Sequence, residues 1–324
     1  MKLADIYMQF QSSIEMIERE LERSVQSRQR ILREASTQLL KAGGKRIRPV
    51  FVLLSAKFGT FTLDDLKHIA IPLELIHMAS LVHDDVIDDA DLRRGEKTIK
   101  SRWDNRVAMY TGDYIFAKAV ETSTYFNNPE IHHILSNAMV EMCIGEVEQI
   151  RDQYNWDQNF RIYLRRIKRK TALLISVSCE LGALAANVDR WIQRRLAKFG
   201  YNVGMSFQIT DDILDFIGTR EQLGKPAGGD LRQGNVTLPA LYAMYKDPKI
   251  KQLIKETFSD RDPLAKKNIE PILEEIKRCG GIDYAKKVSE LYLKKAFEAL
   301  EPLPDTEAKT YLLEIASYIG KREY

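Results

Sequence analysis

Apolar residues recur at three- and four-residue steps along nearly the whole chain. Near the N-terminus, Ile6, Phe10, Ile14, Ile17 and Leu21 follow this spacing, which places them on one helix face. The same periodicity predicts further helices over residues 50–57, 66–89, 107–125, 131–151, 160–187, 191–216, 238–245, 269–277, 284–300 and 306–319. Sustained two-residue alternation between Asn-Gly or Asp-Gly turns is nearly absent. The pattern therefore predicts an all-α fold.

Helix-breaking residues are few and stand mostly at the predicted joints between helices. The chain has ten prolines and seventeen glycines, and Pro49, Pro72, Pro129 and Pro239 are expected in first helical turns. No Ser/Gly-rich linker divides the sequence. We therefore expect residues 1–324 to form a single all-α domain.

Composition and charge restrict the class of protein. A hydrophobic content of 44% suits a sizeable core, and a net charge of only +3 in a chain that is 29% charged does not favour nucleic-acid binding. The apolar stretch 172–179 ends at Glu180, far short of the ~20 residues of a membrane helix. We expect a soluble protein without a signal peptide or transmembrane segment, for which peripheral membrane contact stays possible.

The three cysteines, Cys143, Cys179 and Cys279, are widely scattered and show no metal-type or CxxC spacing. Such a pattern is typical of reduced thiols. It predicts a cytoplasmic location.

Two copies of an acidic pattern carry the strongest functional signal. Asp84, Asp85 and Asp88 form one D-D-x-x-D motif, and the second consists of Asp211, Asp212 and Asp215. Residues i and i+4 share a helix face, where like charges repel. The motifs also adjoin apolar residues, so their carboxylates need neutralisation. Mg²⁺ prefers oxygen ligands, takes one or two carboxylates and completes its shell with water and phosphate. The sequences around the motifs otherwise match poorly, so shared chemistry explains the pair better than an internal duplication.

Basic residues near the first motif predict an anion site. The segment Gly43–Pro49 contains Lys45, Arg46 and Arg48 behind paired glycines and before a helix start. Alone, it could be an ordinary basic turn. Arg93 and Arg94 follow the motif and could be a solvated loop, but beside a metal–diphosphate site they favour anion binding. His77 lies two turns before Asp84 on roughly the same face, and a packing role is the alternative.

Further candidates surround the second motif. Most of the charge run 165–170 is expected to be a solvated face, but Lys170 and Thr171 stand at the edge of an apolar helix. Gln208 precedes the motif, and Lys225 in a glycine-rich loop could cover a phosphate. Asp230 could orient metal-bound water or merely cap a turn.

Together these features predict ionisation of an allylic diphosphate. Neutralised diphosphate is a good leaving group, and a dry apolar pocket protects the resulting carbocation until an alkene attacks it. No Ser-His-Asp set, P-loop or redox motif competes convincingly. The chemistry is prenyl transfer.

These motifs resemble the trans-isoprenyl diphosphate synthases from residue 43 to the segment Thr237–Pro239. The resemblance implies a helical bundle around a deep central cavity, usually dimeric, with about two to three Mg²⁺ ions. It implies that the six motif aspartates bind metal and that all of these except Asp215 are catalytic together with Lys170. By the same resemblance, isopentenyl diphosphate is bound by Lys45, Arg48, His77 and Arg94. The allylic diphosphate, with farnesyl diphosphate as the expected primer, is bound by Arg93, Lys170, Thr171, Gln208 and Lys225.

One position departs from the family pattern. The family often has Gly-Lys before Thr-Leu-Pro, whereas this chain has Gly234 and Asn235. A third lysine contact to the allylic diphosphate is therefore in doubt. Substrate binding could weaken, or another subunit could compensate.

Within the family, the chain is most similar to catalytic large subunits of two-component bacterial enzymes. That resemblance implies a heptaprenyl product for the menaquinone side chain and a heterodimer with a small non-catalytic partner. Small Ala79 and Ser80 before Asp84 leave the upper tunnel open to a long product, and its floor is expected at Ile131, Leu135 and Met139.

Three alternatives stay open at this stage. The first is a self-sufficient homodimer with a hexaprenyl- or octaprenyl-type product. The second is a terpene cyclase, which would not need the basic segment at residues 43–49. The third is a non-catalytic regulatory subunit, which would have no reason to keep all six aspartates.

Overall fold

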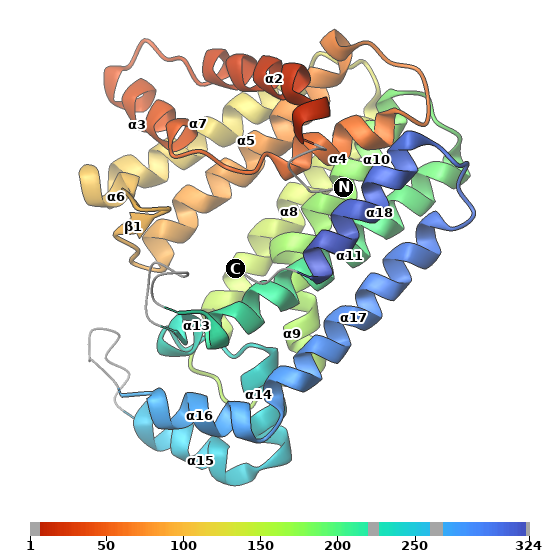
Figure 1. Ribbon diagram of the computed structural model, residues 1–324. Helices are drawn as coiled ribbons and strands as arrows, with labels where there is room; N and C mark the ends of the chain where they lie inside the picture. The colour runs from red at the N-terminus through yellow and green to blue at the C-terminus, as the bar shows by residue number, and fades with distance from the viewer. Residues whose placement is uncertain (1–6, 220–226, 260–267, 322–324) are drawn as a thin grey trace. The chain divides into compact units, whose positions relative to one another are not determined.

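The computed structural model describes residues 7–219, 227–259 and 268–321, and in these ranges the structure is almost entirely helical (Figure 1). Ile6 and Lys225, named above, lie outside the described residues. The chain divides into two compact units, each built from several segments. Unit 1 contains Met1–Met139, Leu174–Gly200 and Ala299–Ile315. Unit 2 contains Val140–Leu173, Tyr201–Glu298 and Ala316–Tyr324. The single domain expected from the sequence stays a prediction.

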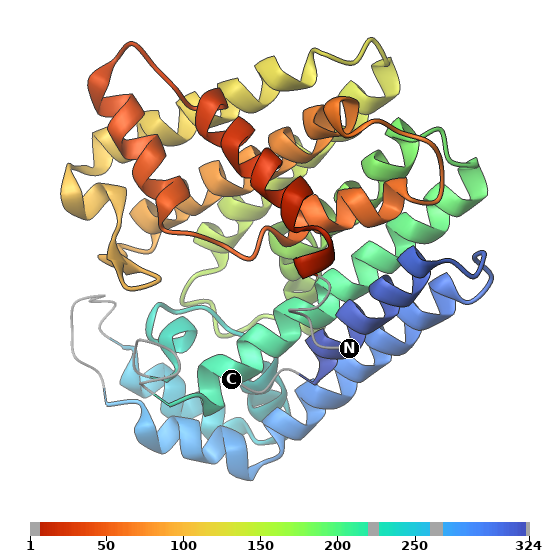
Figure 2. The ribbon, with the colours of Figure 1, turned by 45° about the horizontal axis from the view of Figure 1, so that its top comes forward.

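The described elements before residue 129 belong to unit 1. They are α2 (Gln11–Ser24), α3 (Arg30–Lys41), α4 (Ile47–Ala56), α5 (Leu63–Ile87), β1 (Leu92–Arg93), β2 (Glu96–Lys97), α6 (Ile99–Arg102) and α7 (Asn105–Ser123). Helix α5 packs along α7 and also contacts α4 and α2 (Figure 2). Nine of the ten residues of α4 are buried. The core of unit 1 therefore lies around α4 and α5.

The remaining elements continue the helical pattern. Helices with residues in both units are α8 (Pro129–Asp152), α10 (Leu173–Ala185), α11 (Arg190–Ile217), α17 (Gly281–Leu300) and α18 (Glu307–Gly320). Unit 2 alone contains α9 (Phe160–Ile167), the π-helical turn η1 (Lys168–Ala172), α13 (Gly229–Arg232), α14 (Leu238–Lys246), α15 (Pro248–Thr257) and α16 (Glu270–Arg278). Helices α14, α15 and α16 contact one another, and their apolar faces share a core with α9 and α11.

The structure corrects the expectation for one proline. Pro72 lies inside α5 rather than in a first turn, because the helix begins at Leu63, capped by the Thr62 side chain, which accepts a hydrogen bond from the Asp65 amide. Proline removes one backbone hydrogen bond from a helix interior. The burial of Pro72 and its neighbours in the core offsets that loss.

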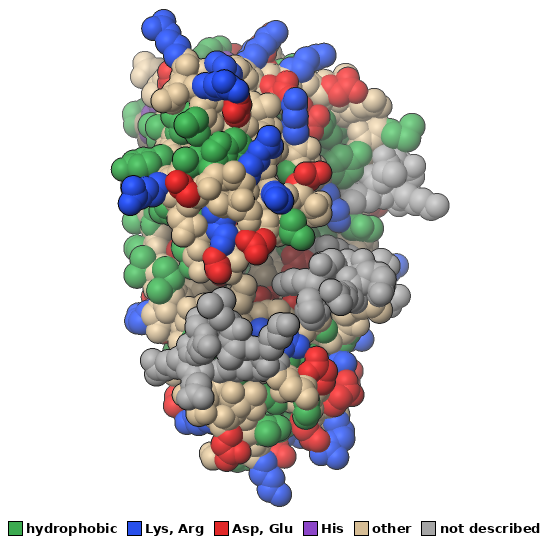
Figure 3. Space-filling model, turned by 90° about the vertical axis from the view of Figure 1, so that its left-hand side faces the viewer, with side chains coloured by type: hydrophobic (Ala, Val, Ile, Leu, Met, Phe, Trp, Pro, Cys, Tyr) green, Lys and Arg blue, Asp and Glu red, His purple; other side chains and the backbone are tan. Residues whose placement is uncertain are grey.

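The described residues also bear on membrane insertion, on the state of the cysteines and on the distribution of surface charge. Among the described residues, no helix is both long and apolar enough to cross a membrane. Cys143, Cys179 and Cys279 are free thiols, and burial raises the pKa of Cys179 to about 12. On the face drawn in Figure 3, basic and acidic side chains are interspersed, which fits the small net charge.

Gly182 allows α10 to approach α4 closely in unit 1. A Cβ atom at this position would lie 2.4 Å from the carbonyl oxygen of Val52. Because backbone atoms cannot give way cheaply, Gly182→Ala is expected to lower the free energy of unfolding by about 1–3 kcal/mol. Chemical denaturation measures the change, and Arg194→Ala on the exposed side of α11 is the control. Equal stability of the two variants would contradict the close contact.

Candidate active site

The first acidic motif ends helix α5 in unit 1. Asp84 and Asp85 occupy the last turn and Asp88 is the C-cap residue, whose amide donates to the Asp84 carbonyl over 2.8 Å. Asp84 and Asp88 are half-buried and stand one turn apart, as the four-residue spacing predicted. This carboxylate pair is the part of the motif best suited to share a cation.

Asp85 already has a resident counter-charge. Its carboxylate is only 4% exposed, and Arg93 donates from Nε to both oxygens over 2.9 and 3.1 Å. The Arg93 Nη2 atom lies 2.7 Å from Oδ1. Burial raises the pKa of Asp85, and Arg93 opposes that shift. Arg93, predicted as a diphosphate contact, is thus bound to the motif itself in this structure.

A small hairpin, not expected from the sequence, positions these arginines. Strands β1 and β2 pair antiparallel, with Arg93 opposite Glu96. Arg94 and Gly95 form the two-residue turn, with φ of 54° and 82°, as a type I′ hairpin turn requires. An Arg-Gly turn lacks the usual Asn-Gly or Asp-Gly signal, which is why sequence reasoning missed it.

The basic segment lies against this hairpin within unit 1. A Cβ atom at Gly44 would be 2.9 Å from Nη1 of Arg94, so the glycine lies directly against that guanidinium. Arg48, in the first turn of α4, is 8% exposed, and its Nε atom has no hydrogen-bond partner. Burial lowers the pKa of Arg48 to about 10. A desolvated guanidinium with an unmet donor is suited to bind an anion.

His77 joins Arg48 and Arg94. Burial, and then the positive charges of Arg48 and Arg94, lower the pKa of His77 well below its usual range. The imidazole is therefore neutral near pH 7. The structure thus gathers three of the four residues expected to bind isopentenyl diphosphate; the fourth, Lys45, is exposed in the segment between α3 and α4.

The second acidic motif lies near the end of α11 in unit 2. Asp212 is 3% exposed and accepts hydrogen bonds from Tyr163 Oη (2.7 Å) and Gln208 Nε2 (2.8 Å). Thr171 Oγ1 donates to Gln208 Oε1 over 2.5 Å. Burial, with the nearby charge of Asp230, raises the pKa of Asp212 to about 7. Tyr163 was not expected from the sequence, because an apolar helix face gives no sign of a buried hydroxyl that donates to a carboxylate.

Neighbouring elements complete this cluster. The predicted helix 160–187 is interrupted by the π turn η1, which contains Lys170 and Thr171. Such turns are frequent at functional sites because they re-aim side chains. Lys170 Nζ donates to Gln149 Oε1 over 3.2 Å. The buried Asp215 carboxylate accepts a hydrogen bond from the Asp230 amide over 3.1 Å, so at least the backbone of Asp230 supports the motif.

Asn235, the departure from the family pattern, is nearly buried in unit 2. Its backbone N–H donates to the Asp230 carbonyl over 2.8 Å. Its side-chain Oδ1 is buried without a hydrogen-bond partner. Gly234 has a φ of 78° and lies against the Tyr154 ring, where a Cβ would approach to 2.7 Å. Packing therefore restricts the backbone at Gly234, whichever side chain stands at position 235.

The motif carboxylates fit a hard divalent cation by their oxygen donors. Within the described ranges, however, no three His, Cys, Asp or Glu side chains form a set that could hold a metal alone. Mg²⁺ needs only one or two carboxylates when substrate phosphate and water supply the rest. The residues present are thus suited to a metal that arrives with, or is completed by, a diphosphate.

Residues expected to set product length lie in unit 1. Ala79 is fully buried, and Ser80 is half-buried with its hydroxyl donating to the His77 carbonyl over 2.8 Å. Ile131 and Leu135 on α8 are buried, and Met139 is half-buried. Their role in chain length stays a prediction.

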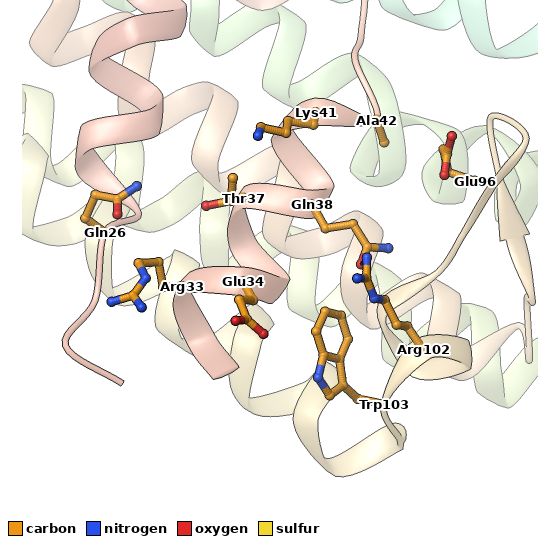
Figure 4. A pocket seen from close by; sticks show the side chains of 10 residues that line it. All are labelled: Gln26, Arg33, Glu34, Thr37, Gln38, Lys41, Ala42, Glu96, Arg102 and Trp103. Atoms are coloured by element: carbon orange, nitrogen blue, oxygen red, sulfur yellow. Dashed lines mark hydrogen bonds between the residues drawn. The ribbon is translucent and has the colours of Figure 1, made fainter. Parts of the chain in front are cut away.

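A surface pocket of about 630 Å³ in unit 1 does not involve the motifs (Figure 4). Three cations and two carboxylates share its wall with an aromatic ring. The lining residues are Gln26, Arg33, Glu34, Thr37, Gln38, Lys41, Ala42, Glu96, Arg102 and Trp103. In Figure 4, Arg102 points toward Gln38, to which it donates over 2.9 Å. The mixed charge of this surface pocket does not favour the binding of a diphosphate.

Comparison with known proteins agrees with the sequence interpretation. A model of the polyprenyl synthetase family matches residues 29–276. Heptaprenyl diphosphate synthase component 2 of Bacillus subtilis is 57% identical over 324 residues, which is 100% of this chain and 92% of that protein. The heptaprenyl diphosphate synthase structure from Staphylococcus aureus is 42% identical, with a TM-score of 0.92 over 97% of this chain and 98% of that one.

A third similar structure carries ligands. The polyprenyl synthase of Caulobacter crescentus, solved with calcium and isoprenyl diphosphate, is 31% identical, with a TM-score of 0.93 over 99% of this chain and 98% of that chain. Proteins of this family typically depend on a divalent metal. The all-α fold expected from the sequence is confirmed.

Tyr163 is predicted to hold the Asp212 carboxylate in place. Tyr163→Phe removes only the hydroxyl. At a pH above the Asp212 pKa of about 7, where the carboxylate is ionised, losing this hydrogen bond is expected to cost about 1.5–3 kcal/mol of stability. Denaturation of the metal-free protein measures it, and Tyr284→Phe in the same unit is the control, since Tyr284 contributes ring stacking. If both variants lose the same stability, the hydroxyl has no such role.

Proposed function

Because the chain belongs to the polyprenyl synthetase family, we propose that it elongates an allylic diphosphate with isopentenyl diphosphate to give heptaprenyl diphosphate. Its membership makes it a prenyltransferase, and the predicted enzyme class is confirmed. The observation that supports the proposal best is the gathering of Arg48, His77 and Arg94 in unit 1, the unit that also contains the first acidic motif. A terpene cyclase would not need this second anion site.

Isopentenyl diphosphate is the proposed ligand of the basic cluster. Arg48 and Arg94 offer charged donors to phosphate oxygens, and Lys45 adds a third cation from the preceding segment. Neutral His77 adds a hydrogen-bond donor. Since Arg48 is already desolvated in the protein, binding an anion satisfies its unmet Nε donor.

The allylic diphosphate is the proposed ligand of the acidic motifs. We propose that Asp84, Asp85 and Asp88, with Asp211, Asp212 and Asp215, hold Mg²⁺ ions, about two to three by family resemblance. The bound metal would neutralise the charge that develops as diphosphate departs. Arg93, Lys170, Thr171 and Gln208 are the proposed protein contacts to this substrate, joined by Lys225 outside the described residues.

Two of these contacts need rearrangement of existing bonds. Arg93 is engaged by Asp85, and Lys170 by Gln149. A divalent metal that came with the diphosphate would supply Asp85 with another counter-charge, and the Arg93 guanidinium would then be available to phosphate oxygens. Asn235 carries no positive charge. Lys170 therefore contributes a larger share of the positive charge around the allylic diphosphate than it would if a lysine followed Gly234.

We propose further that the chain works with a small partner subunit that lacks the aspartate motifs. The support is the similarity over the full chain to a protein named as one component of a two-component enzyme. A homodimer that makes a hexaprenyl- or octaprenyl-type product is the alternative.

Arg48→Ala is expected to raise the KM for isopentenyl diphosphate at least about tenfold, since each 1.4 kcal/mol of lost binding is a factor of ten. The KM for farnesyl diphosphate should stay within about twofold. Steady-state kinetics with each substrate varied in turn measure both values. Lys41→Ala, a basic neighbour that lines the pocket of Figure 4, is the control. An unchanged isopentenyl KM in Arg48→Ala would contradict the assigned role.

The partner requirement is tested by product analysis. The purified chain is incubated with farnesyl diphosphate, isopentenyl diphosphate and Mg²⁺, alone and with a candidate small subunit. Long product is expected only in the mixture, with heptaprenyl diphosphate dominant by chromatography. Robust long-chain synthesis by the chain alone would instead support the homodimer.

A further inference from the structure

Arg46 is the one cation of the basic segment that the predicted binding sets leave out, and it is buried. It is 7% exposed, whereas neighbouring Lys45 faces solvent. Its Nη2 donates to the Leu40 carbonyl of α3 over 3.2 Å, its Nε to Glu18 of α2 over 3.3 Å, and its Nη1 to Glu74 of α5 over 3.2 Å. One guanidinium therefore joins three helices of unit 1.

The backbone at Arg46 is strained. Its φ of 45° and ψ of 37° are in the left-handed region, which residues with a Cβ seldom adopt. Such a conformation persists only where surrounding contacts over-determine it. The three hydrogen bonds of the Arg46 side chain are contacts of this kind, and Arg48 follows two residues later in the same segment.

Glu74 is the buried member of this set. It is 3% exposed on α5, about one turn before His77, and its Oε1 bonds Arg46. Its Oε2 atom is buried without a hydrogen-bond partner. The Glu74 charge also acts on Arg48 and Arg94, where it opposes the lowering of their pKa values by burial. One buried carboxylate thus bonds the guanidinium of Arg46 and acts electrostatically on those of Arg48 and Arg94.

We propose that Glu74 is a positioning residue: as the resident counter-charge of Arg46, Arg48 and Arg94, it keeps the basic cluster assembled before a diphosphate arrives. Buried like charges repel, and a guanidinium left buried without an anion is strongly destabilised. The identity of the ligand rests on the proposed function. The role of Glu74 as a counter-charge is argued only from the burial and contacts of Glu74, and it does not depend on which anion binds.

The sign of the effect separates positioning from simple charge tuning. Glu74→Gln keeps the size of the side chain and a carbonyl that can accept from Arg46, but removes the negative charge. If Glu74 only weakened the local field, its loss would improve anion binding and lower the isopentenyl KM. If Glu74 holds the cluster together, its loss disperses the arginines, and that KM rises.

The experiment compares the wild type, Glu74→Gln and Glu18→Gln in the complete enzyme, with any required partner present. Glu18 also pairs with Arg46 but is half exposed, so it controls for loss of a carboxylate on the same guanidinium. We expect the isopentenyl KM to rise about tenfold in Glu74→Gln, with the farnesyl diphosphate KM and kcat within about twofold. Glu18→Gln should match the wild type. An unchanged or lower isopentenyl KM in Glu74→Gln overturns the proposal.

A second variant covers the case in which Glu74→Gln fails to fold. Replacing both members of a buried ion pair by apolar residues is often neutral for stability, so Arg46→Met combined with Glu74→Leu is expected to fold. It lacks the counter-charge, and its isopentenyl KM should still be raised. A normal KM in the folded double variant overturns the proposal.

A binding measurement separates this proposal from the proposed function. Inorganic diphosphate without divalent metal is added to each variant, and the shift in thermal midpoint is recorded. The shift should be smaller in Glu74→Gln than in the wild type or Glu18→Gln, and equal shifts overturn the proposal. If the wild type binds diphosphate in this way but does not consume isopentenyl diphosphate, the proposed function fails while the role of Glu74 stands.

Discussion

Charged side chains buried among apolar helices must each find a partner of opposite charge, and this constraint organises the candidate site. Taking an ion out of water costs several kcal/mol unless a partner and hydrogen bonds replace the lost hydration. In unit 1, Asp85 is matched by Arg93, and Arg46 by Glu74. Arg48 retains an unmet donor. The paired groups stabilise the structure, whereas the unmet donor of Arg48 is suited to bind an anion.

Unit 2 meets the same constraint with neutral donors. Asp212 is held by a tyrosine hydroxyl and a glutamine amide, and the glutamine is held in turn by Thr171. Neutral donors fix the orientation of a carboxylate without cancelling its charge. That arrangement suits the proposed role of Asp212 in binding a cation, whereas the arginine on Asp85 provides a charge that a cation could replace.

Helix irregularities place these groups. The left-handed turn at Arg46, the hairpin turn at Arg94 and Gly95, and the π turn around Lys170 each depart from regular structure at a functional candidate. A regular helix would bring side chains to the same face only at intervals of about one turn. Each departure costs energy that the packed helices around it supply.

The periodicity of apolar residues determined the all-α class and the course of most helices, because one buried face per helix leaves its mark at every turn. Residue type and spacing likewise determined the chemistry, since paired aspartates beside clustered arginines have few other uses. Only the tertiary structure decided that Pro72 lies within a helix and that Arg93 and Arg94 flank a tight turn. It also decided that Glu74 bonds Arg46 and that Tyr163 bonds Asp212. Glu74 and Tyr163 stand in apolar helical stretches and look there like ordinary residues. Their roles depend on which atoms lie within about 3 Å of them, and that is decided by packing between segments far apart in the sequence.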